Sequence, residues 1–453
     1  MTKRYLTIPA VVAGALGLGA AARASDAQPT TAELMKQIDE LQAKVQQMEA
    51  KQSALTTQTV NDTVERVLRD ADKRSQLLQM EGFTAGMKDG RFYLGSVDGD
   101  NTFMPYLLFQ VRSTSNHNDT DGDTNSQSGY SLPRIELGFD GRVFKKFEYF
   151  VRWNSGDSDG GGNGPLNLEQ AWIRHELNDQ FALRSGQMVD PVFGEQLVAN
   201  GKLLAADRSM MNQIITGADQ SYTQGAVLEW TPDSKLKVEI GYTDGINTGN
   251  TNFQDFPDAA TNFGFAGRAT YCVFGNPADA LDFSAMGNKE DMLMLGAGFD
   301  WTEAGDTNAV EYTFDVQWEN AAGLAIYGAF VGQWIQNGSG TGITGVTLGN
   351  DDHSNWGALV QVSYMLNAEW EIFGRYDYTN LDDAIAVGNS GSTQDAFNEV
   401  TAGVNWYFHG HNAKFTADLS WLPDGAPAGL TNLGILSSDD YEVVFRTQFQ
   451  LML

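Results

Sequence analysis

The chain has 453 residues, of which 58 are acidic and 29 are basic, so its formal net charge is −29 at pH 7. This charge would repel a phosphate backbone, which excludes a nucleic-acid partner. The single cysteine, Cys272, excludes an internal disulfide and a cysteine-based zinc site, and we interpret it as a small strand residue. Glycine is abundant (49 residues) and proline is scarce (11 residues), which suits many strands joined by turns.

Residues 1–24 have the pattern of a secretory signal peptide. Lys3 and Arg4 precede an apolar run that ends in Ala22-Arg23-Ala24, and this ending matches the small-residue cleavage site of such signals. We therefore expect the mature chain to lie outside the cytoplasm, with a membrane-spanning anchor as the alternative. No later stretch reaches the ~20 consecutive apolar residues of a spanning helix, so any further crossing must use strands.

Residues 25–81 are predicted to form a helical stalk. From Leu34 to Leu55, mostly apolar side chains recur at alternating spacings of four and three residues, which is the seam of a coiled coil. Because about three heptads make only a marginal helix in isolation, we expect the segment to associate with copies of itself. A lone amphipathic helix that rests on the rest of the protein is the alternative.

From residue 82 onward the sequence is typical of strands and turns. Residues 82–96 are expected to form a short hairpin around Asp89-Gly90. Sixteen longer strands are predicted at 102–113, 131–142, 146–155, 168–177, 180–188, 223–231, 235–244, 264–273, 291–301, 309–319, 323–335, 354–366, 369–379, 397–408, 413–421 and 440–452. A tilted strand crosses a bilayer with ~9 to 11 residues, whereas strands of soluble folds average ~5 to 6. The predicted lengths therefore favour a membrane barrel.

The predicted connections alternate between short and long. Short joins such as 143–145 are followed by long ones such as 156–167 and 189–222. A bacterial outer-membrane barrel has short periplasmic turns and longer external loops, so this rhythm supports the same fold. Two joins depart from it, because 274–290 is long for a turn and 302–308 is short for a loop.

The stretch AVEYTFDVQWEN, residues 309–320, shows how the strand faces are assigned. Every second residue from Val310 to Trp318 is apolar, which gives the strand one apolar face. Glu311, Asp315 and Glu319 lie on the opposite, polar face. Six tryptophans lie at or near predicted strand ends, as in an interfacial aromatic girdle: Trp318, Trp334, Trp356, Trp370, Trp406 and Trp421. We therefore assign the apolar face to lipid. The sequence predicts an all-β transmembrane β-barrel of 16 antiparallel strands over 82–453, preceded by a short periplasmic coiled-coil helix.

Four stretches resemble the phosphate-selective porin O and P family of bacterial outer membranes. They are GMKDGRFYLGS, RSGQMVDPVFGEQLVANGKLLAADRSM (184–210), VTAGVNWYFHGHNAKFTADLSW (400–421) and FRTQFQLML. The resemblance implies a trimeric 16-stranded barrel whose third external loop, here 189–222, folds inward as a constriction. Two features depart from the family: the chain ends in Leu453 where an aromatic residue is usual, and it is acidic although phosphate selectivity needs a basic pathway.

The alternation along the predicted strands assigns a set of basic side chains to the water-facing inner side of the barrel, which we call the wet face. The candidates for the pore lining are Arg112, Arg134, Arg152, Arg184, Lys237, Arg375 and Arg446, and those in the constriction loop are Glu195, Lys202, Asp207 and Arg208. A column of arginines in a narrow channel offers paired donors to phosphate or carboxylate. The alternative is that each arginine pairs with a lumen carboxylate, such as Glu136, Glu148 or Glu239, and braces the wall. Because the acidic excess falls mainly in predicted external loops, which would gather cations, the charge of the solute is left open.

The first predicted long loop, 114–130, contains the acidic run HNDTDGDTN. Its spacing departs from the helix-loop-helix calcium pattern because no glutamate closes the loop. We expect a solvated acidic loop, with a calcium site formed by Asp119, Asp121 and Asp123 as the alternative. The sequence contains no nucleophile-base-acid arrangement, no phosphate-cradling glycine loop and no zinc spacing, so we expect neither an enzyme nor a cofactor.

The leading hypothesis is an outer-membrane porin that passes small hydrophilic solutes down their gradient, with anions such as phosphate as one candidate. The expected partners are outer-membrane lipid, solutes or ions, further copies in a homotrimer, and the cell wall, which the stalk would contact. The stalk pattern by itself favours a dimer. A structural envelope barrel with an occluded lumen is the competing hypothesis, because 189–222 is long enough to fill the lumen, and a soluble secreted sandwich is a third.

Overall fold

In the computed structural model the chain divides into two compact units, residues 1–77 and 78–453. The structure describes residues 32, 35–36, 38–48, 51, 64–67, 69, 83–88, 91–120, 123–156, 164–250, 263–337, 342–343, 346–348, 352–382, 384–387, 395–427, 429–436 and 440–453. The predicted signal peptide and the Asp89-Gly90 turn lie outside these residues. Among the described residues, no helix has the length and apolar character needed to cross a bilayer.

The described residues of the N-terminal unit are all helical, which agrees with the helix predicted there. Ile38, Leu41, Val45 and Met48 fall on the predicted seam, and each is about half exposed or more. The described part of this helix therefore leaves its apolar stripe uncovered. The coiled coil itself stays a prediction.

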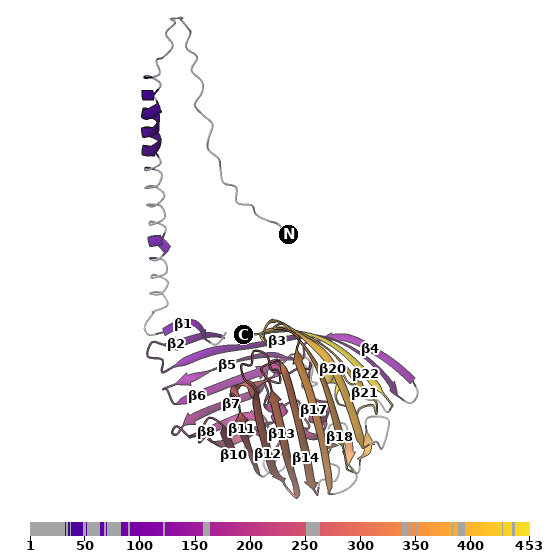
Figure 1. Cartoon of the computed structure of the whole chain (residues 1–453). Coiled ribbons are helices and arrows are strands. Elements are labelled where there is room, and N and C mark those ends of the chain that lie inside the picture. The colour runs from indigo at the N-terminus through magenta and orange to yellow at the C-terminus, as the bar shows by residue number, and fades with distance from the viewer. Residues whose placement is uncertain are drawn as a thin grey trace. The chain divides into compact units, whose positions relative to one another are not determined.

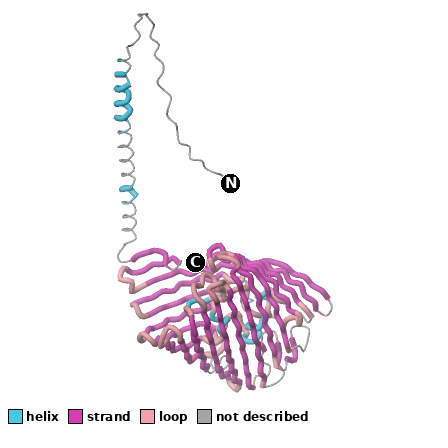
Figure 2. The backbone as a smooth tube through the Cα atoms, in the orientation of Figure 1, coloured by secondary structure: helices cyan, strands magenta, loops and turns pink. Residues whose placement is uncertain are grey.

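The second unit is built around a closed antiparallel barrel (Figures 1 and 2). Its sixteen described barrel strands are β3 (Thr102–Thr120), β5 (Ile135–Val143), β6 (Phe147–Asn154), β7 (Asn167–Glu176), β8 (Phe181–Val189), β9 (Tyr222–Trp230), β10 (Leu236–Thr243), β11 (Phe263–Phe274), β12 (Met292–Ala304), β13 (Thr307–Glu319), β14 (Leu324–Gln336), β17 (His353–Met365), β18 (Trp370–Asn380), β20 (Ala396–His409), β21 (Ala413–Leu422) and β22 (Glu442–Met452). Each strand pairs with the next, and β22 pairs with β3 to close the ring. The predicted 16-stranded antiparallel barrel is confirmed.

Two hairpins extend this sheet. β1 (Phe83–Lys88) pairs with β2 (Arg91–Ser96), as predicted, and β2 continues onto the start of β3. β4 (Asp123–Ser131) pairs with the second half of β3. The prediction of a loop over 114–130 was therefore wrong. This part of β3 and β4 is rich in Ser, Thr and Asn, so no apolar alternation marks it as strand.

The strand faces follow the predicted alternation. On β13, Tyr312 and Phe314 are 37% and 59% exposed on the outer face, whereas Glu311 and Glu319 are buried on the inner face. The outer face also carries Trp334, Trp356, Trp406 and Trp421, together with Phe445, Phe449 and Leu451 of the closing strand. Apolar side chains outside and carboxylates inside are the arrangement expected of a barrel in lipid, and this part of the prediction is confirmed.

The connection 190–221 between β8 and β9 folds into the barrel. It contains α2 (Gly194–Leu197), the 3-10 helix η1 (Asn200–Lys202) and α3 (Met210–Thr216), drawn in cyan among the strands in Figure 2. Most of its residues are buried. The Ser209 side chain accepts a hydrogen bond from the Asn212 N–H at the start of α3, and Gly217 ends the helix at a φ of 76°. We call this connection the inserted loop.

The connection 275–291 between β11 and β12 enters the barrel from the opposite end, which explains why it exceeds the length of the neighbouring turns. It contains the 3-10 helix η2 (Pro277–Leu281). The ring centroids of Phe283 and Tyr327 lie 4.6 Å apart, and Ser284 Oγ donates to Glu371 at 2.7 Å. We call this connection the inserted turn.

The remaining described elements lie at the end of the barrel that carries the long loops. β15 (Gly342–Ile343), β16 (Val346–Leu348) and β19 (Ala384–Val387) form a small separate sheet, and the 3-10 helix η3 (Thr431–Leu433) precedes β22. The modest join predicted at 302–308 shortens to a tight turn between β12 and β13.

An apolar core lies inside the barrel. Its members come from the inserted loop, from the inward face of the strands and from the segment before β22, and they include Phe193, Val198, Leu204, Met210, Met211, Ile214, Phe373, Phe397, Leu430 and Leu433. Burying each large apolar side chain stabilises the packed state by about 1.5–3 kcal/mol. The inserted loop is therefore held as firmly as a segment of an ordinary protein core. Cys272 is buried on β11, in agreement with its interpretation as a small strand residue.

Candidate solute pathway

Three of the predicted wet-face arginines converge on Asp207 of the inserted loop. Arg112 places Nη1 and Nη2 at 2.5 and 2.8 Å from the two oxygens of Asp207. Arg134 Nη2 lies 3.2 Å away and Arg446 Nη1 lies 3.7 Å away. Burial alone would raise the pKa of Asp207, but the three guanidinium groups hold it below its ordinary value. This carboxylate therefore ties the loop to both strands of the β3–β22 closure.

Asp219, at the far end of the same loop, forms a second ion-paired centre. Arg134 Nη2 and Arg208 Nη1 donate to its two oxygens at 2.8 and 3.0 Å. Burial opposes ionisation, but these two cations outweigh it and lower the pKa of Asp219. Arg208 also donates to the backbone carbonyls of Glu195 and Val198, so it joins the beginning and the end of the inserted loop.

The strand carboxylates hold the start of α3. The backbone N–H groups of Met210 and Met211 donate to Glu399 and Asp377 at 2.9 and 3.0 Å. Arg375 Nη2 lies 3.2 Å from Glu399, and its Nη1 donates to the carbonyl of Asp207 at 2.9 Å. Negative side chains at a helix N-terminus also interact favourably with the helix dipole.

The other candidates of the constriction loop have different surroundings. Glu195 accepts hydrogen bonds from the Ser209 N–H at 2.9 Å and from its hydroxyl at 2.7 Å. Burial raises the pKa of Glu195 in spite of these bonds and of Arg375. Lys202 lies on η1 and is half-buried.

Arg152 completes the buried set. Its Nε lies 2.6 Å from Glu169 and its Nη1 lies 3.4 Å from Glu136. The five arginines described so far on the wall, Arg112, Arg134, Arg152, Arg375 and Arg446, are each at most 4% exposed. They lie in ion pairs within the wall or between the wall and the inserted loop. That they line the path of a solute stays a prediction.

The wall from β7 to β11 is different because three of its cations are more accessible, although Arg268 on β11 is buried. Arg184 Nη2 and Lys237 Nζ both pair with Glu239, at 2.7 and 3.0 Å, and their side chains are 17% and 42% exposed. Arg174 pairs with Glu229 at 2.7 Å and is 25% exposed. We call this stretch the open wall.

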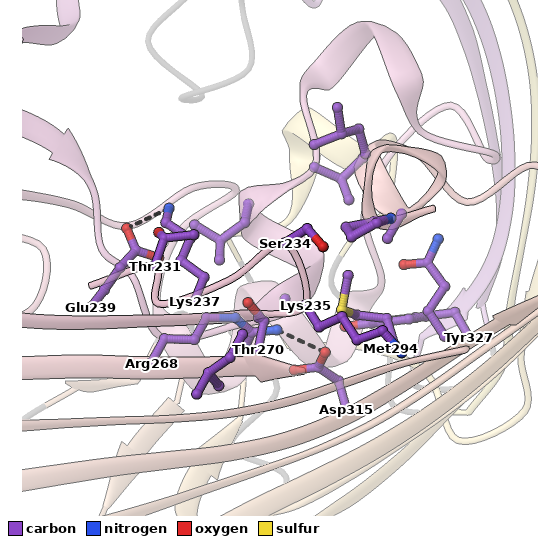
Figure 3. A pocket seen from close by; sticks show the side chains of 18 residues that line it. Thr231, Ser234, Lys235, Lys237, Glu239, Arg268, Thr270, Met294, Asp315 and Tyr327 are labelled. Carbon is purple, nitrogen blue, oxygen red and sulfur yellow. Dashed lines mark hydrogen bonds and ion pairs between the residues drawn. The ribbon is translucent and has the colours of Figure 1, made fainter. Parts of the chain in front are cut away.

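Two cavities adjoin the open wall. One has a volume of about 380 Å³ and lies between β10, β11 and β13 on one side and α2 and η2 of the two inserted segments on the other (Figure 3). The second has a volume of about 420 Å³ and is lined by Arg174, Glu229 and the turn after β7. Thr231 lines both, so the two cavities adjoin one another.

A second ion pair borders the first cavity. Arg268 Nη2 donates to Asp315 Oδ1 at 2.8 Å, shown as a dashed line in Figure 3, and its Nη1 donates to the carbonyl of Val192 at 2.9 Å. The pair therefore fixes the start of the inserted loop against β11 and β13. A Cβ on Gly194 or on Gly296 would lie within 3.0 Å of this pair, which explains why both positions are glycine.

Several charged residues of the lumen were missed from the sequence. Glu399 and Asp418 have the inward parity of their strands and could have been found by the same alternation that found the arginines. Asp219 and Asp190 lie in the inserted loop, whose sequence has no alternation of apolar and polar residues from which burial could be predicted. Burial raises the pKa of Asp190, with Asp300 and Glu311 adding to the effect.

The calcium alternative gains no support from the fold. Asp119 belongs to β3 and Asp123 begins β4, while Asp121 lies outside the described residues. Within the part of the chain that the structure describes, no group of three or more His, Cys, Asp or Glu side chains is arranged to hold a metal ion.

Comparison with known proteins places this barrel in a family. The model of the family "Phosphate-selective porin O and P" matches residues 109–423. No curated protein matches the chain by sequence. Similar solved structures include the anion-selective porin from Comamonas acidovorans (12% identity, TM-score 0.53, covering 78% of this chain and 100% of that one), OprB of Pseudomonas putida (10%, 0.51, 77% and 94%) and the outer membrane channel DcaP of Acinetobacter baumannii (11%, 0.50, 79% and 99%). At these identities the likeness shows the fold alone. Because the family model spans more than half of the chain and the fold agrees with it, the chain belongs to the phosphate-selective porin O and P family and is an outer-membrane diffusion channel.

Proposed function

We propose that small hydrophilic solutes and ions diffuse passively along the open wall, between β7–β11 and the inserted loop. One observation carries this route. The partly exposed cations Arg174, Arg184 and Lys237 lie on this wall, together with the two adjoining cavities of about 380 and 420 Å³. The apolar core occupies the opposite side, where a third and smaller cavity of about 250 Å³ lies beside β3, β4 and η3.

The charges of the open wall support weak ion selectivity. Arg174, Arg184 and Lys237 each pair with carboxylates at 2.7–3.0 Å, so these three side chains do not face a solute as unpaired cations. The chain as a whole carries a net charge of −29, which favours cations around the protein at low ionic strength. Inorganic anions such as phosphate would then be one class of solute among several, and not a tightly selected one.

The assembly and the stalk belong to the same proposal. We place residues 1–24 as a cleaved signal, 25–81 as a periplasmic stalk and 82–453 as the barrel in contact with outer-membrane lipid. The exposed apolar stripe from Ile38 to Met48 supports association of the stalk with further copies. The family resemblance supports a homotrimer, and a stalk of this length could contact the cell wall. Chemical cross-linking of the full chain, compared with a chain that lacks 32–77, tests the contribution of the stalk.

Single-channel recording in planar bilayers tests the transport role. We expect discrete conductance steps in KCl, and a chain that folds as a barrel but passes no current would overturn the proposal. Reversal potentials in asymmetric KCl test the charge preference, for which we expect a permeability ratio within about threefold of unity. Strong selectivity for phosphate would contradict the proposal that the paired charges of the open wall give only weak selectivity.

The tight packing of the inserted loop favours one competing function, a structural envelope barrel with an occluded lumen. Replacing residues 196–216 by a short glycine-serine linker separates the two. A diffusion channel should conduct before the replacement and conduct more after it. A structural barrel with other obstructions should show no current in either form.

A further inference from the structure

The cavity of about 380 Å³ between the inserted segments and the open wall has an unusual composition for a channel that passes only inorganic ions (Figure 3). We propose that it is a binding site for small organic monoanions with an apolar body, such as aromatic or short-chain carboxylates, in preference to inorganic phosphate. This inference rests on the proposed diffusion along the open wall and names the class of solute that the wall takes.

One side of the cavity is aliphatic. Leu197 at the end of α2 and Leu281 at the end of η2 are 40% and 60% exposed, and both line the cavity. Neither belongs to a barrel strand, so the lipid face does not account for their exposure. Pro277 of the inserted turn and Met294 of β12 also line the cavity. Exposed apolar surface is less favourable than buried apolar surface, so a solute with an apolar body would be stabilised here.

The other side of the cavity carries more cations than anions. Lys237 pairs with Glu239 and Arg268 pairs with Asp315, whereas Lys235 Nζ donates to the carbonyl of Val273. The described lining residues therefore carry a net charge of +1. One negative charge on the solute would balance this lining. A second negative charge would have to approach Glu239 or Asp315.

Two cations of the lining, Lys237 and Arg268, indicate where the anionic group would bind. Arg268 is 6% exposed, and its Nε has no hydrogen-bond partner among the described residues, although Nη1 and Nη2 are both occupied. A charged donor that is buried without a partner carries a desolvation cost, which a negative charge in the adjoining cavity would reduce. A solute carboxylate beside Lys237, whose side chain is 42% exposed, would gain a charge-assisted hydrogen bond in the same cavity that the guanidinium of Arg268 lines.

Inorganic phosphate fits this arrangement less well. Its four oxygens all require hydrogen-bond donors, and the aliphatic side formed by Leu197 and Leu281 offers none. Taking those oxygens out of water without partners is costly, whereas an organic carboxylate turns its apolar end toward the leucines. Mostly apolar cavities with a few placed polar groups are typical sites for organic molecules.

The test compares three anions on the full-length channel in planar bilayers with symmetric KCl. Benzoate supplies a carboxylate with an apolar body, acetate supplies the carboxylate alone, and phosphate supplies the inorganic anion. We expect benzoate to reduce the KCl current with a half-blocking concentration about tenfold lower than that of acetate or phosphate. Equal block by phosphate, or stronger block, would overturn the proposal.

Two variants separate the two sides of the site. Lys237→Gln should weaken the block by benzoate and acetate alike, because it removes charge. Leu281→Asn should weaken the block by benzoate alone, by about fivefold, and no change in that variant would contradict the aliphatic role. Lys289→Gln, a lysine on the same inserted turn that does not line the cavity, is the matched control and should leave all three unchanged.

The site and the proposed function can fail separately. A channel that conducts KCl but does not distinguish benzoate from phosphate overturns the site and leaves the diffusion role intact. A chain that passes no KCl current overturns the diffusion role. In that case calorimetric titration of benzoate and phosphate onto the full-length protein in detergent still decides the site, since equal heats for both would reject it.

Discussion

Basic residues lie on both sides of the lumen, but they differ in burial and in the carboxylates with which they pair. On the side of the β3–β22 closure, Arg112, Arg134 and Arg446 meet the carboxylate of Asp207 and are at most 1% exposed. On the open wall, Arg184 and Lys237 pair with strand carboxylates and stay partly exposed. The inserted loop makes the difference, because it brings both a carboxylate and an apolar core to one side only. An inward arginine therefore does not by itself indicate a pore-lining residue.

The energetics of the two sides differ for the same reason. A buried ion pair contributes little net stability, because desolvation of both charges offsets their attraction, but removing one partner leaves an uncompensated charge. An exposed pair on the wall can be replaced by water at small cost. Substitutions on the two sides should therefore have very different consequences.

The largest effect is expected from Asp207→Asn. It leaves three buried guanidinium groups without their shared anion, so docking of the inserted loop should weaken by ~3–5 kcal/mol. Limited proteolysis within 190–221 and thermal unfolding followed by circular dichroism in detergent measure the change. Asp179→Asn, on an exposed turn, is the control. Unchanged protease resistance of the Asp207 variant would mean that the apolar core alone holds the loop.

Acid should release the inserted loop. The pKa values of Asp207 and Asp219 are lower in the docked state than their ordinary value near 3.9, so the released loop binds more protons than the docked one. Their stabilisation is complete above that ordinary value and is lost as the pH falls through the lowered pKa values. Glu195, whose pKa burial raises, acts in the opposite direction at higher pH.

We therefore expect the KCl conductance to rise reversibly below about pH 3 as the loop leaves the lumen. Recording between pH 6 and pH 2.5 checks this, and Asp207→Asn should flatten the dependence. A conductance that falls in acid in both proteins would place the titrating groups elsewhere.

A smaller effect is expected from Gly298→Ala on β12. A Cβ at this position would lie 2.2 Å from the carbonyl oxygen of Val192, so the start of the inserted loop must move. Overpacking of this kind costs ~1–3 kcal/mol and removes no ion pair. Gly328→Ala on β14, where the added methyl meets no atom within 3.5 Å, is the matched control. Equal melting temperatures for the two variants would show that the loop does not pack as described.

Charge reversal on the open wall should change selectivity without changing stability. Lys237→Glu alters the wall by two charges at a distance of several ångströms from a passing ion. After screening by salt, this corresponds to about a twofold shift of the permeability ratio toward cations. Reversal potentials in asymmetric KCl measure it, with Lys289→Glu as the control. An unchanged ratio would remove Lys237 from the pathway.

The smallest effect is expected at the short turn between β5 and β6. Lys145 Nζ lies 2.9 Å from Asp100, and the lysine side chain is 69% exposed. Because water solvates such a pair well, Lys145→Ala should give no measurable change in melting temperature or conductance. A clear loss of stability would show that the distinction between buried and exposed pairs does not hold in this barrel.

The sequence by itself determined the barrel. A spanning strand has lipid on one side and water on the other, so apolar and polar residues alternate along it. For this reason the ends of most strands were predicted to within two residues, and the outward face of β13 was assigned correctly. The prediction was wrong over 114–130, where the strand-forming segments carry mainly polar side chains and no such period exists.

Only the tertiary structure decided which side chains hold the inserted loop in the lumen. Asp207 meets Arg112 and Arg446, which are far from it in sequence, because β22 closes onto β3 and brings their side chains to the loop. The apolar core of the inserted loop and the entry of the inserted turn likewise depend on contacts between distant segments. A segment enclosed in the barrel does not alternate between lipid and water, so its sequence shows no period. The residues that it contacts are decided by closure of the ring and not by a local pattern.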